Sequence, residues 1–325
     1  MKPFKFSEIL KTTIWGGKDI VAMKGLDDNR PDIGESWEIS GVAGAETQVA
    51  DGDDVGATLA ELIGKYREDF LGKENYQRYG TTFPLLIKFI STSRPLSVQV
   101  HPNDEMAHRM GHPYGKTEMW YVVDAAPGAE LYLGFNHDFT KEGLVSSLQN
   151  GTLADHLALH HTAPGDCFFI PAGRIHNIGA GNLVIEIQQN SNDTFRVYDF
   201  DRVDASGHKR PLHVAQACEA LNYKEACDSR RNYEAASNQP VVLVDCPEFT
   251  TRLLQIAKEV TIDYEELDSF VVYVAYEGAA VLEDSEGHQI ELVKGQTVLF
   301  PAQNKLVKIF PKADSRFACL ETYIK

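Results

Sequence analysis

Short apolar segments, each long enough for a single strand, dominate the middle of this 325-residue sequence. Segments of this kind with turn residues between them favour a β-sandwich or a barrel. The segments that we predict to be strands are Leu85–Ile90, Leu96–His101, Glu118–Val123, Ala129–Leu133, Cys167–Ile170, Leu183–Gln188 and Thr194–Tyr198. The fold class is therefore expected to be dominated by β-structure.

Three other stretches are predicted to be helical and to pack outside the strands: Ala57–Tyr66, Lys141–Leu159 and Leu212–Arg231. Apolar residues recur at helical spacing in the first stretch, and the other two contain no proline and little glycine. The polar residues of the last two that could be mistaken for ligands are interpreted as solvated helix faces: His156, His160, His161, Glu219 and Glu225.

The predicted strand Leu96–His101 carries its polar side chains on one face. Because successive side chains alternate along a strand, Ser97, Gln99 and His101 point to the same side. Burying polar groups without partners costs about 1–3 kcal/mol each, so some favourable interaction must offset the burial of this face. A bound cation is one source of such an interaction.

Further metal ligands follow along the chain. Glu118 opens another predicted strand, and His176 comes just after a Pro-Ala-Gly turn. Together with His101 and Gln99 they form a nitrogen and oxygen set without sulfur, which suits zinc. Such an ion could polarise a hydroxyl or carbonyl oxygen as a Lewis acid. The alternative is that both histidines are ordinary buried residues.

The segment around His176 carries a recognisable pattern. Gly165, Pro171, Gly173 and His176 have the spacing G-x5-P-x-G-x2-H, which is similar to the second motif of the cupins. That resemblance implies jelly-roll barrels with a metal in the mouth of one barrel. The cupin motif usually ends with Asn four residues after the histidine, where this chain has Ala180.

The order Gln-x-His-Pro followed by Lys-x-Glu-Met-Trp-Tyr, at residues 99–102 and 116–121, resembles the short bacterial type I mannose-6-phosphate isomerases. Further segments agree with that family: 13–17 (TIWGG), 34–38 (GESWE), 83–88 (FPLLIK) and 192–199 (NDTFRVYD). The resemblance implies one zinc ion per chain, bound by Gln99, His101, Glu118 and His176. It also implies interconversion of mannose 6-phosphate and fructose 6-phosphate through an enediol or enediolate.

Cationic residues are candidates for the remaining chemistry. Arg196 matches the family's segment and is expected to be catalytic, since a guanidinium can form paired hydrogen bonds to phosphate or to an enediolate. Lys116 would share the face of Glu118 and is a second catalytic candidate. Substrate binding is expected from Ser97, Lys88, Lys116 and Arg196. Lys88 could instead be a wall residue whose ammonium points outward.

A weak internal repeat indicates a second barrel. The segment that begins at Gly295, GQTVLFPA, resembles the one that begins at Gly165, GDCFFIPA. Counting eleven residues on from each glycine gives His176 in the first copy and Leu306 in the second. We therefore expect a catalytic cupin jelly roll with helical insertions over 1–236, and a metal-free cupin-like jelly roll over 237–325.

Charge and composition exclude some classes of binding partner and indicate the cellular location. The formal charge of −16 argues against nucleic acid or an anionic membrane as a partner, because these call for basic patches. The five cysteines form no C-x-x-C pair, which indicates reduced thiols. The first residues lack a signal-peptide core, and no run approaches the roughly 20 apolar residues of a membrane span. A cytoplasmic location is expected, whereas the oligomeric state stays open.

Two other functions fit parts of the pattern. A cupin with two histidines and one carboxylate could hold Fe(II) as an oxygenase, although Gln99 would then fill a position that oxygen needs. A sugar-phosphate sensor without turnover is the second alternative, although it has no need of the full ligand set. Oxygen uptake would distinguish the first, and binding without turnover the second.

Overall fold

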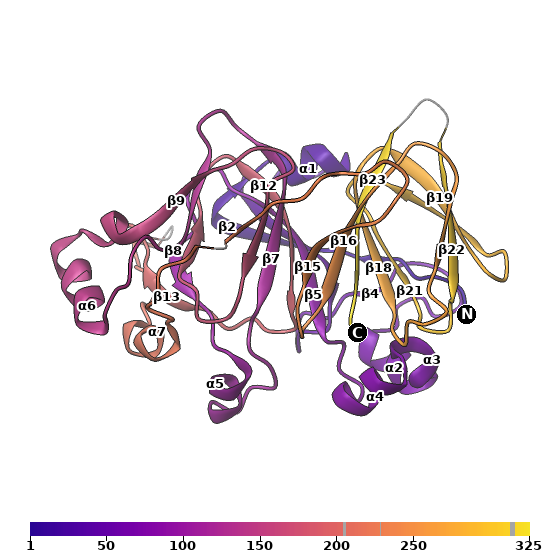
Figure 1. Ribbon diagram of the computed structural model, residues 1–325, viewed down its shortest axis with the longest axis horizontal. Helices are drawn as coiled ribbons and strands as arrows, with labels where there is room; N and C mark the ends of the chain where they lie inside the picture. The colour runs from indigo at the N-terminus through magenta and orange to yellow at the C-terminus, as the bar shows by residue number, and fades with distance from the viewer. Residues whose placement is uncertain (204–205, 228, 313–315) are drawn as a thin grey trace.

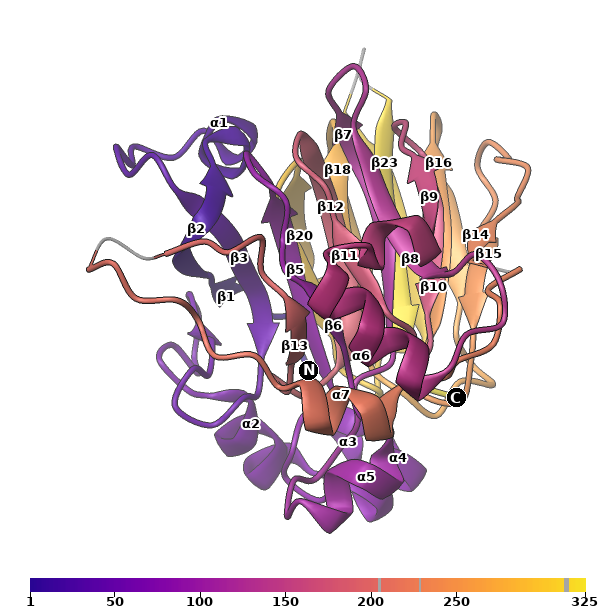
Figure 2. The same cartoon turned by 90° about the vertical axis from the view of Figure 1, so that its left-hand side faces the viewer.

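The computed structural model describes residues 1–203, 206–227, 229–312 and 316–325, and sheets stacked side by side make up most of it (Figure 1). The helices lie at the periphery, as the two views show (Figures 1 and 2). Within the described ranges the strands form one seven-stranded, two five-stranded, one four-stranded and one two-stranded sheet. The predicted β-dominated fold class is therefore confirmed.

Residues 9–231 supply two facing sheets. The seven-stranded sheet contains, in spatial order, β14 (Arg230–Arg231), β10 (Cys167–Ile170), β7 (Glu118–Ala125), β12 (Asn182–Gln189), β5 (Leu85–Ser91), β3 (Ile33–Ser40) and β2 (Ile9–Gly17). The five-stranded sheet contains β13 (Phe195–Tyr198), β6 (Val98–Val100), β11 (His176–Ile178), β8 (Glu130–Phe135) and β9 (Leu157–His161). An apolar cluster that includes Trp120 and Val184 of the first sheet and Leu133 of the second fills part of the space between them.

Residues 241–323 supply the other two large sheets. One contains β15 (Val241–Asp245), β16 (Thr250–Ile256), β23 (Phe317–Tyr323), β18 (Val271–Glu277) and β21 (Thr297–Phe300). The other contains β17 (Val260–Asp263), β22 (Leu306–Pro311), β19 (Ala279–Asp284) and β20 (Gln289–Val293). The eight strands β16 to β23 follow one another along the chain and pair in the same order as β5 to β12. The smallest sheet joins β1 (Phe6–Ser7) to β4 (Gln48–Val49).

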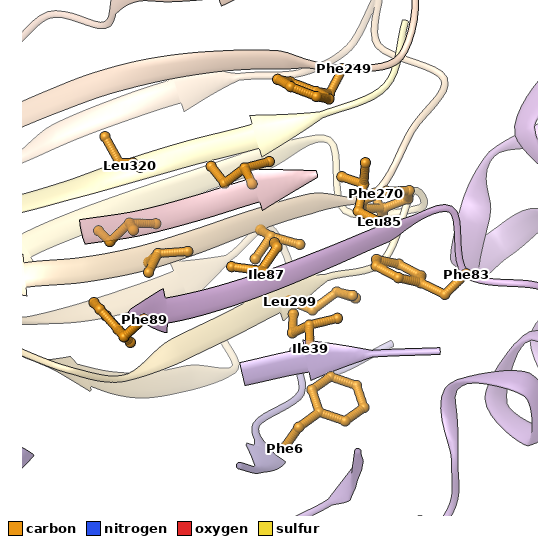
Figure 3. Packing of buried hydrophobic residues seen from close by; sticks show 14 of the residues in the cluster. Phe6, Ile39, Phe83, Leu85, Ile87, Phe89, Phe249, Phe270, Leu299 and Leu320 are labelled. Carbon is orange, nitrogen blue, oxygen red and sulfur yellow. The ribbon is translucent and has the colours of Figure 1, made fainter. Parts of the chain in front are cut away.

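The largest apolar core lies between the seven-stranded sheet and the five-stranded sheet of residues 241–323. Leu85, Ile87 and Phe89 alternate along β5 and meet Leu320 of the other sheet and Phe270, the residue before β18 (Figure 3). Each fully buried side chain of this size contributes about 1.5–3 kcal/mol. Since alternate residues of β5 face this core, the residues between them, Lys88 included, face the interior of the first pair of sheets.

The helices begin and end as α1 (Asp19–Lys24), α2 (Leu59–Tyr66), α3 (Glu68–Leu71), α4 (Lys73–Tyr79), α5 (Asp104–Arg109), α6 (Lys141–Asn150) and α7 (Val214–Ala220), with a 3₁₀ turn at Leu153–His156. Thr58 and Glu61 form a capping box that fixes the start of α2. Residues of α6 and α7 pack with Val98 and Val100 on the outer face of the five-stranded sheet of β13 to β9. No helix in the described part of the chain is long and apolar enough to cross a bilayer.

The strand predictions are confirmed, with ends that move by at most a few residues. The helix predicted over 57–66 is confirmed as α2, but the other two were too long. Helix α6 ends where Gly151 takes a left-handed conformation, so His160 and His161 lie on strand β9 instead of a helix. Helix α7 ends at Ala220, because Leu221 is extended and the chain then runs to β14.

Candidate metal centre and substrate cavity

Three neighbouring strands of one sheet place a row of polar side chains toward the interior. Arg196 of β13 pairs with Gln99 of β6, and Gln99 pairs with His176 of β11. Directly paired residues project on the same face of a sheet, so the three side chains form a line. Ser97 and His101 extend the same face of the β6 segment.

The opposing sheet carries a second row. Glu186 of β12 pairs with Lys88 on one side and with Trp120 on the other. One carboxylate oxygen of Glu186 accepts a hydrogen bond from Lys88 Nζ at 3.0 Å, and the other accepts one from Trp120 Nε1 at 2.9 Å. Glu118 lies two residues before Trp120 and therefore faces the same interior.

Two imidazoles and one carboxylate converge where these rows meet. His176 Nε2 lies 3.4 Å from Glu118 Oε1, and His101 Nε2 lies 3.5 Å from Glu118 Oε2. All three side chains are buried, and one ligand atom from each lies within 4.8 Å of the others. This is the group that the sequence predicts as the core of a metal site.

The outer nitrogens of both imidazoles have backbone partners. His101 Nδ1 is 2.7 Å from the carbonyl oxygen of Asp193, and His176 Nδ1 is 2.8 Å from that of Arg174. A carbonyl can only accept, so each Nδ1 carries the proton and each Nε2 presents a lone pair toward Glu118. Metal-binding histidines are oriented by contacts of this kind.

Burial sets the protonation states of the three groups. It lowers the pKa of His176 to about 4 and that of His101 well below its ordinary value, so both rings are neutral near pH 7. Burial and the nearby Glu186 charge raise the pKa of Glu118 to about 7. The Lys116 ammonium, 3.0 Å from Oε2, forms an ion pair with the Glu118 carboxylate, and no hydrogen bond within the described residues joins that carboxylate to either imidazole. A buried carboxylate between two neutral imidazoles is a ligand set that fits a divalent cation.

Gln99 can complete the ligand set after one side-chain rotation. Its Nε2 lies 3.3 Å from His176 Nε2, while its Oε1 accepts a hydrogen bond from Ser97 Oγ at 3.2 Å. Turning the amide by half a turn exchanges Oε1 and Nε2, so that Oε1 lies beside His176 Nε2 at the candidate metal centre. Ser97 tolerates this exchange, because a hydroxyl can accept from the amide nitrogen as well as donate to the oxygen.

Local backbone contacts hold the ligands together. The Pro-Ala-Gly turn contains Gly173 at φ 84°, and its N–H donates to the carbonyl oxygen of His101 at 2.9 Å. A Cβ at Gly115 would lie 2.5 Å from the backbone of Asn103, so only glycine allows this close approach beside Lys116. Lys116 Nζ is consequently placed 3.0 Å from Glu118 Oε2 and 3.0 Å from His101 Nε2.

We call His101, Glu118 and His176 the metal group. A cavity of about 690 Å³ opens beside it. The predicted substrate residues Lys88, Ser97, Lys116 and Arg196 line it, as do residues of the first strands such as Trp15. The Lys88 ammonium points into this interior, because it pairs with the buried Glu186 carboxylate. The volume suits a small polar ligand.

Some groups of the site escaped the sequence analysis. They are Glu186, the indole of Trp120, the backbone carbonyl of Asp193, and Arg210, which also lines the cavity. Glu186 did carry a signal, since it is a charged residue inside the otherwise apolar run Leu183–Ile187. Arg210 lies in an irregular segment with no pattern to reveal it.

The corresponding place in the second pair of sheets is apolar. Counting from Gly295 predicted Leu306 at the position of His176, but the buried inward residue of β22 is Val307. The turn before β22 is therefore one residue longer than the turn before β11. Among the described residues, Asp284, Glu286 and His288 also lie close together. There the Asp284 carboxylate already accepts from the backbone N–H groups of Glu286 and His288, so it is satisfied as a turn residue.

Comparison with known proteins identifies relatives of this chain. A family model described as the catalytic domain of type I phosphomannose isomerase matches residues 4–138. The mannose-6-phosphate isomerase ManA of Bacillus subtilis is 39% identical over 68% of both chains. The putative mannose-6-phosphate isomerase YvyI of the same organism is 33% identical over 93% of both chains.

Solved structures agree with the sequence relatives. The crystal structure of the mannose 6-phosphate isomerase from Bacillus subtilis superimposes on the whole chain with a TM-score of 0.88 at 30% identity. A putative mannosephosphate isomerase from Archaeoglobus fulgidus shares the fold, with a TM-score of 0.79 at 23% identity. The match covers 100% of this chain and 98% of the Archaeoglobus chain.

Proposed function

Since the chain belongs to the type I phosphomannose isomerase family, whose members are aldose–ketose isomerases of mannose 6-phosphate, we propose that it works with one zinc ion and through an enediol(ate). The ligands would be His101, Glu118 and His176, with Gln99 as the fourth. The observation that carries this proposal is the buried convergence of the Glu118 carboxylate with two neutral imidazoles.

The reaction moves one proton between neighbouring carbons. A base removes the C2 proton of the open-chain aldose while the C1 oxygen gains a proton, which gives the enediol. Return of a proton to C1, with loss of the proton on the C2 oxygen, gives the ketose. Bound zinc would supply Lewis-acid stabilisation of oxygen charge at this end of the cavity.

The chain's own residues then bind and orient the sugar. Arg196, next to Gln99 in the row, can donate paired hydrogen bonds to an oxygen that becomes negative. Lys116 lies within reach of the metal group and is the proposed acid–base residue. Lys88, held by Glu186, presents an ammonium to the same cavity, and Ser97 borders it.

We also propose that both halves of the chain are cupin-like jelly rolls, over 1–236 and 237–325, and that the second holds no catalytic metal. The repeated strand order and the apolar residue Val307 support this division. A cytoplasmic location is part of the same proposal, supported by the five free cysteines.

The test is an isomerisation assay with mannose 6-phosphate, before chelation, after chelation and after zinc is returned. We expect turnover to disappear with chelation and to recover with zinc. Recovery with Fe(II) and oxygen uptake would favour an oxygenase instead. Binding of mannose 6-phosphate without turnover in the zinc-loaded protein would favour a sensor.

A further inference from the structure

The cavity has a second arginine beside Arg196. Arg196 lies on β13, the edge strand of its sheet, and its backbone exchanges hydrogen bonds with His213, so the segment before α7 follows this free edge. Arg196 Nη1 also donates to the carbonyl oxygen of Pro211 at 3.0 Å. Arg210 precedes that proline and lines the cavity with Arg196. It therefore lies on the side of Arg196 away from Gln99.

This end of the cavity carries excess positive charge. Arg210 donates to the Asp199 carboxylate through Nε at 2.8 Å and Nη2 at 2.5 Å. Arg202 donates to the same carboxylate at 2.5 Å but does not line the cavity. The guanidinium groups of Arg202 and Arg210 thus share one carboxylate. Arg196 lies beside them without an ion pair to a carboxylate among the described residues, so the three arginines and Asp199 carry two excess positive charges in a chain of net charge −16.

The two cavity arginines have donors to spare. Within the described part of the chain, Arg196 Nε is buried without a hydrogen-bond partner. Arg210 uses Nε and Nη2 for Asp199, and its Nη1 donates no hydrogen bond to a described residue. Burial and then the charge of Arg210 lower the pKa of Arg196, as expected for cations that repel each other. A bound anion would satisfy these donors and relieve the repulsion.

The carboxylates elsewhere in the cavity wall are not paired with these two arginines. Glu186 is paired with Lys88. Glu35 accepts a hydrogen bond from the indole of Trp37 at 2.6 Å, and its charge acts on Lys88. Asp32 is exposed to solvent. An anionic group entering the cavity is therefore attracted to its Arg196 and Arg210 end.

We propose that Arg210 binds the phosphate group of the sugar phosphate together with Arg196, an inference that rests on the proposed function. Asp199 acts as a positioning residue, because it holds the Arg210 guanidinium in place. The substrate then lies with its phosphate at the edge strand β13 and its C1–C2 end at His101, Glu118 and His176.

The experiment compares two variants that each lose a guanidinium contact to the Asp199 carboxylate. Arg210→Ala removes a cavity arginine, whereas Arg202→Ala removes one outside the cavity. Losing a charge-assisted hydrogen bond should raise the KM of Arg210→Ala for mannose 6-phosphate about 10- to 100-fold, with little change in kcat. Inhibition by inorganic phosphate should weaken in parallel, while inhibition by unphosphorylated mannose should stay the same. Arg202→Ala should keep the wild-type constants.

Equal KM values in the two variants, or equal loss of phosphate and mannose inhibition, would overturn the proposal. Thermal melts check folding, and Arg210→Lys should give an intermediate KM, because it keeps the charge without the paired donors. If the wild-type protein does not isomerise mannose 6-phosphate, the proposed function fails by itself. Calorimetric titration of inorganic phosphate into the wild type and both alanine variants then still decides whether Arg210 binds the anion.

Discussion

The two pairs of sheets share a strand order but use their interiors differently. The pair formed by residues 9–231 encloses a polar cavity with a candidate metal group, whereas the pair formed by residues 241–323 is filled by an apolar cluster around Tyr273 and Phe300. The strands supply the same positions in both. The residue types at those positions decide whether the interior can hold a ligand.

One row is shared by both interiors. Glu186 pairs with Lys88 and Trp120, and by the same register Glu321 of β23 pairs with Arg252 and Tyr273. Arg252 donates to the Glu321 carboxylate, as Lys88 does to that of Glu186. A cation, a carboxylate and an aromatic ring thus recur side by side, so this row belongs to the scaffold and does not by itself indicate catalysis.

The ligand positions are the ones that differ. Ile170 pairs with Glu118 in the first interior, and Phe300 pairs with Val271 in the second, so Val271 takes the place of Glu118. Tyr264, two residues beyond Ile262, takes the place of His101 and donates to Glu321 through its hydroxyl. The carboxylate that faces two imidazoles in one half is therefore replaced by apolar packing in the other.

The largest expected effect comes from replacing His176 with valine, the residue type found at the matching position, Val307, in the second half. We expect His176→Val to lose both metal and activity, with turnover reduced by about 10³-fold or more, because several kcal/mol of charge stabilisation depend on the ion. Metal analysis of the purified variant and the isomerisation assay measure the two losses. Full metal content in this variant would remove His176 from the ligand set.

The shared row predicts a different result in the second half. Glu321→Gln should destabilise the protein by about 3–5 kcal/mol, because it leaves Arg252 without its buried partner. Metal content and the KM of the folded enzyme should not change. Glu186→Gln is the matched variant and should lower both stability and activity, since its row faces the cavity. Urea unfolding and steady-state kinetics separate the two effects, and a loss of metal in Glu321→Gln would contradict the division of roles.

The buried Glu118 carboxylate predicts a pH effect in metal-free protein. Glu118 titrates near its ordinary value of 4.5 in the unfolded chain and near about 7 when folded, owing to burial. The folded state thus binds more protons between these values, so this group lowers stability as pH rises from 4.5 to 7, by up to about 3 kcal/mol.

The measurement has to be a difference between variants. His101 and His176 have lowered pKa values, so their contribution to stability rises with pH over much of the same window. Urea unfolding of chelated wild type and chelated Glu118→Gln at pH 5 and pH 7.5 isolates the carboxylate. We expect the wild type to lose stability relative to the variant as pH rises. A difference that does not change with pH would argue against a buried carboxylate of raised pKa.

Local sequence predicted the elements whose boundaries are local. Strand β10 matches its predicted ends, because Gly165 before it and Pro171 after it interrupt the pattern. The shared face of Ser97, Gln99 and His101 was predictable for the same reason, since alternate residues of a strand project to one side. The stretch 212–231 contains residues compatible with a helix, but Arg230 and Arg231 pair with β10, a tertiary contact that no periodicity reveals.

Other features depended on contacts between distant segments. The residue that matches His176 is Val307 instead of the predicted Leu306, because the turn before β22 is one residue longer. A count along the chain does not detect this extra residue. Arg210 lies at the cavity only because the segment before α7 follows the edge of β13. Resemblance to the isomerase family supplied the ligand set, whereas the pairing of Lys88 with Glu186 required the register of β5 and β12.

The smallest expected effect concerns Ser97, which holds the amide of Gln99. Ser97→Ala removes the hydroxyl that can hydrogen-bond the Gln99 amide in either orientation. Gln99 then lacks the contact that would orient it toward a bound metal. We expect metal affinity to fall about tenfold, the low end for losing a contact that orients a ligand, with turnover largely kept at saturating zinc. Competition with a chelator measures the affinity, and Ser97→Thr is the control because it keeps the hydroxyl. If Ser97 instead binds substrate, the KM for mannose 6-phosphate should rise while metal affinity stays the same, and the role assigned to the Ser97–Gln99 contact would be wrong.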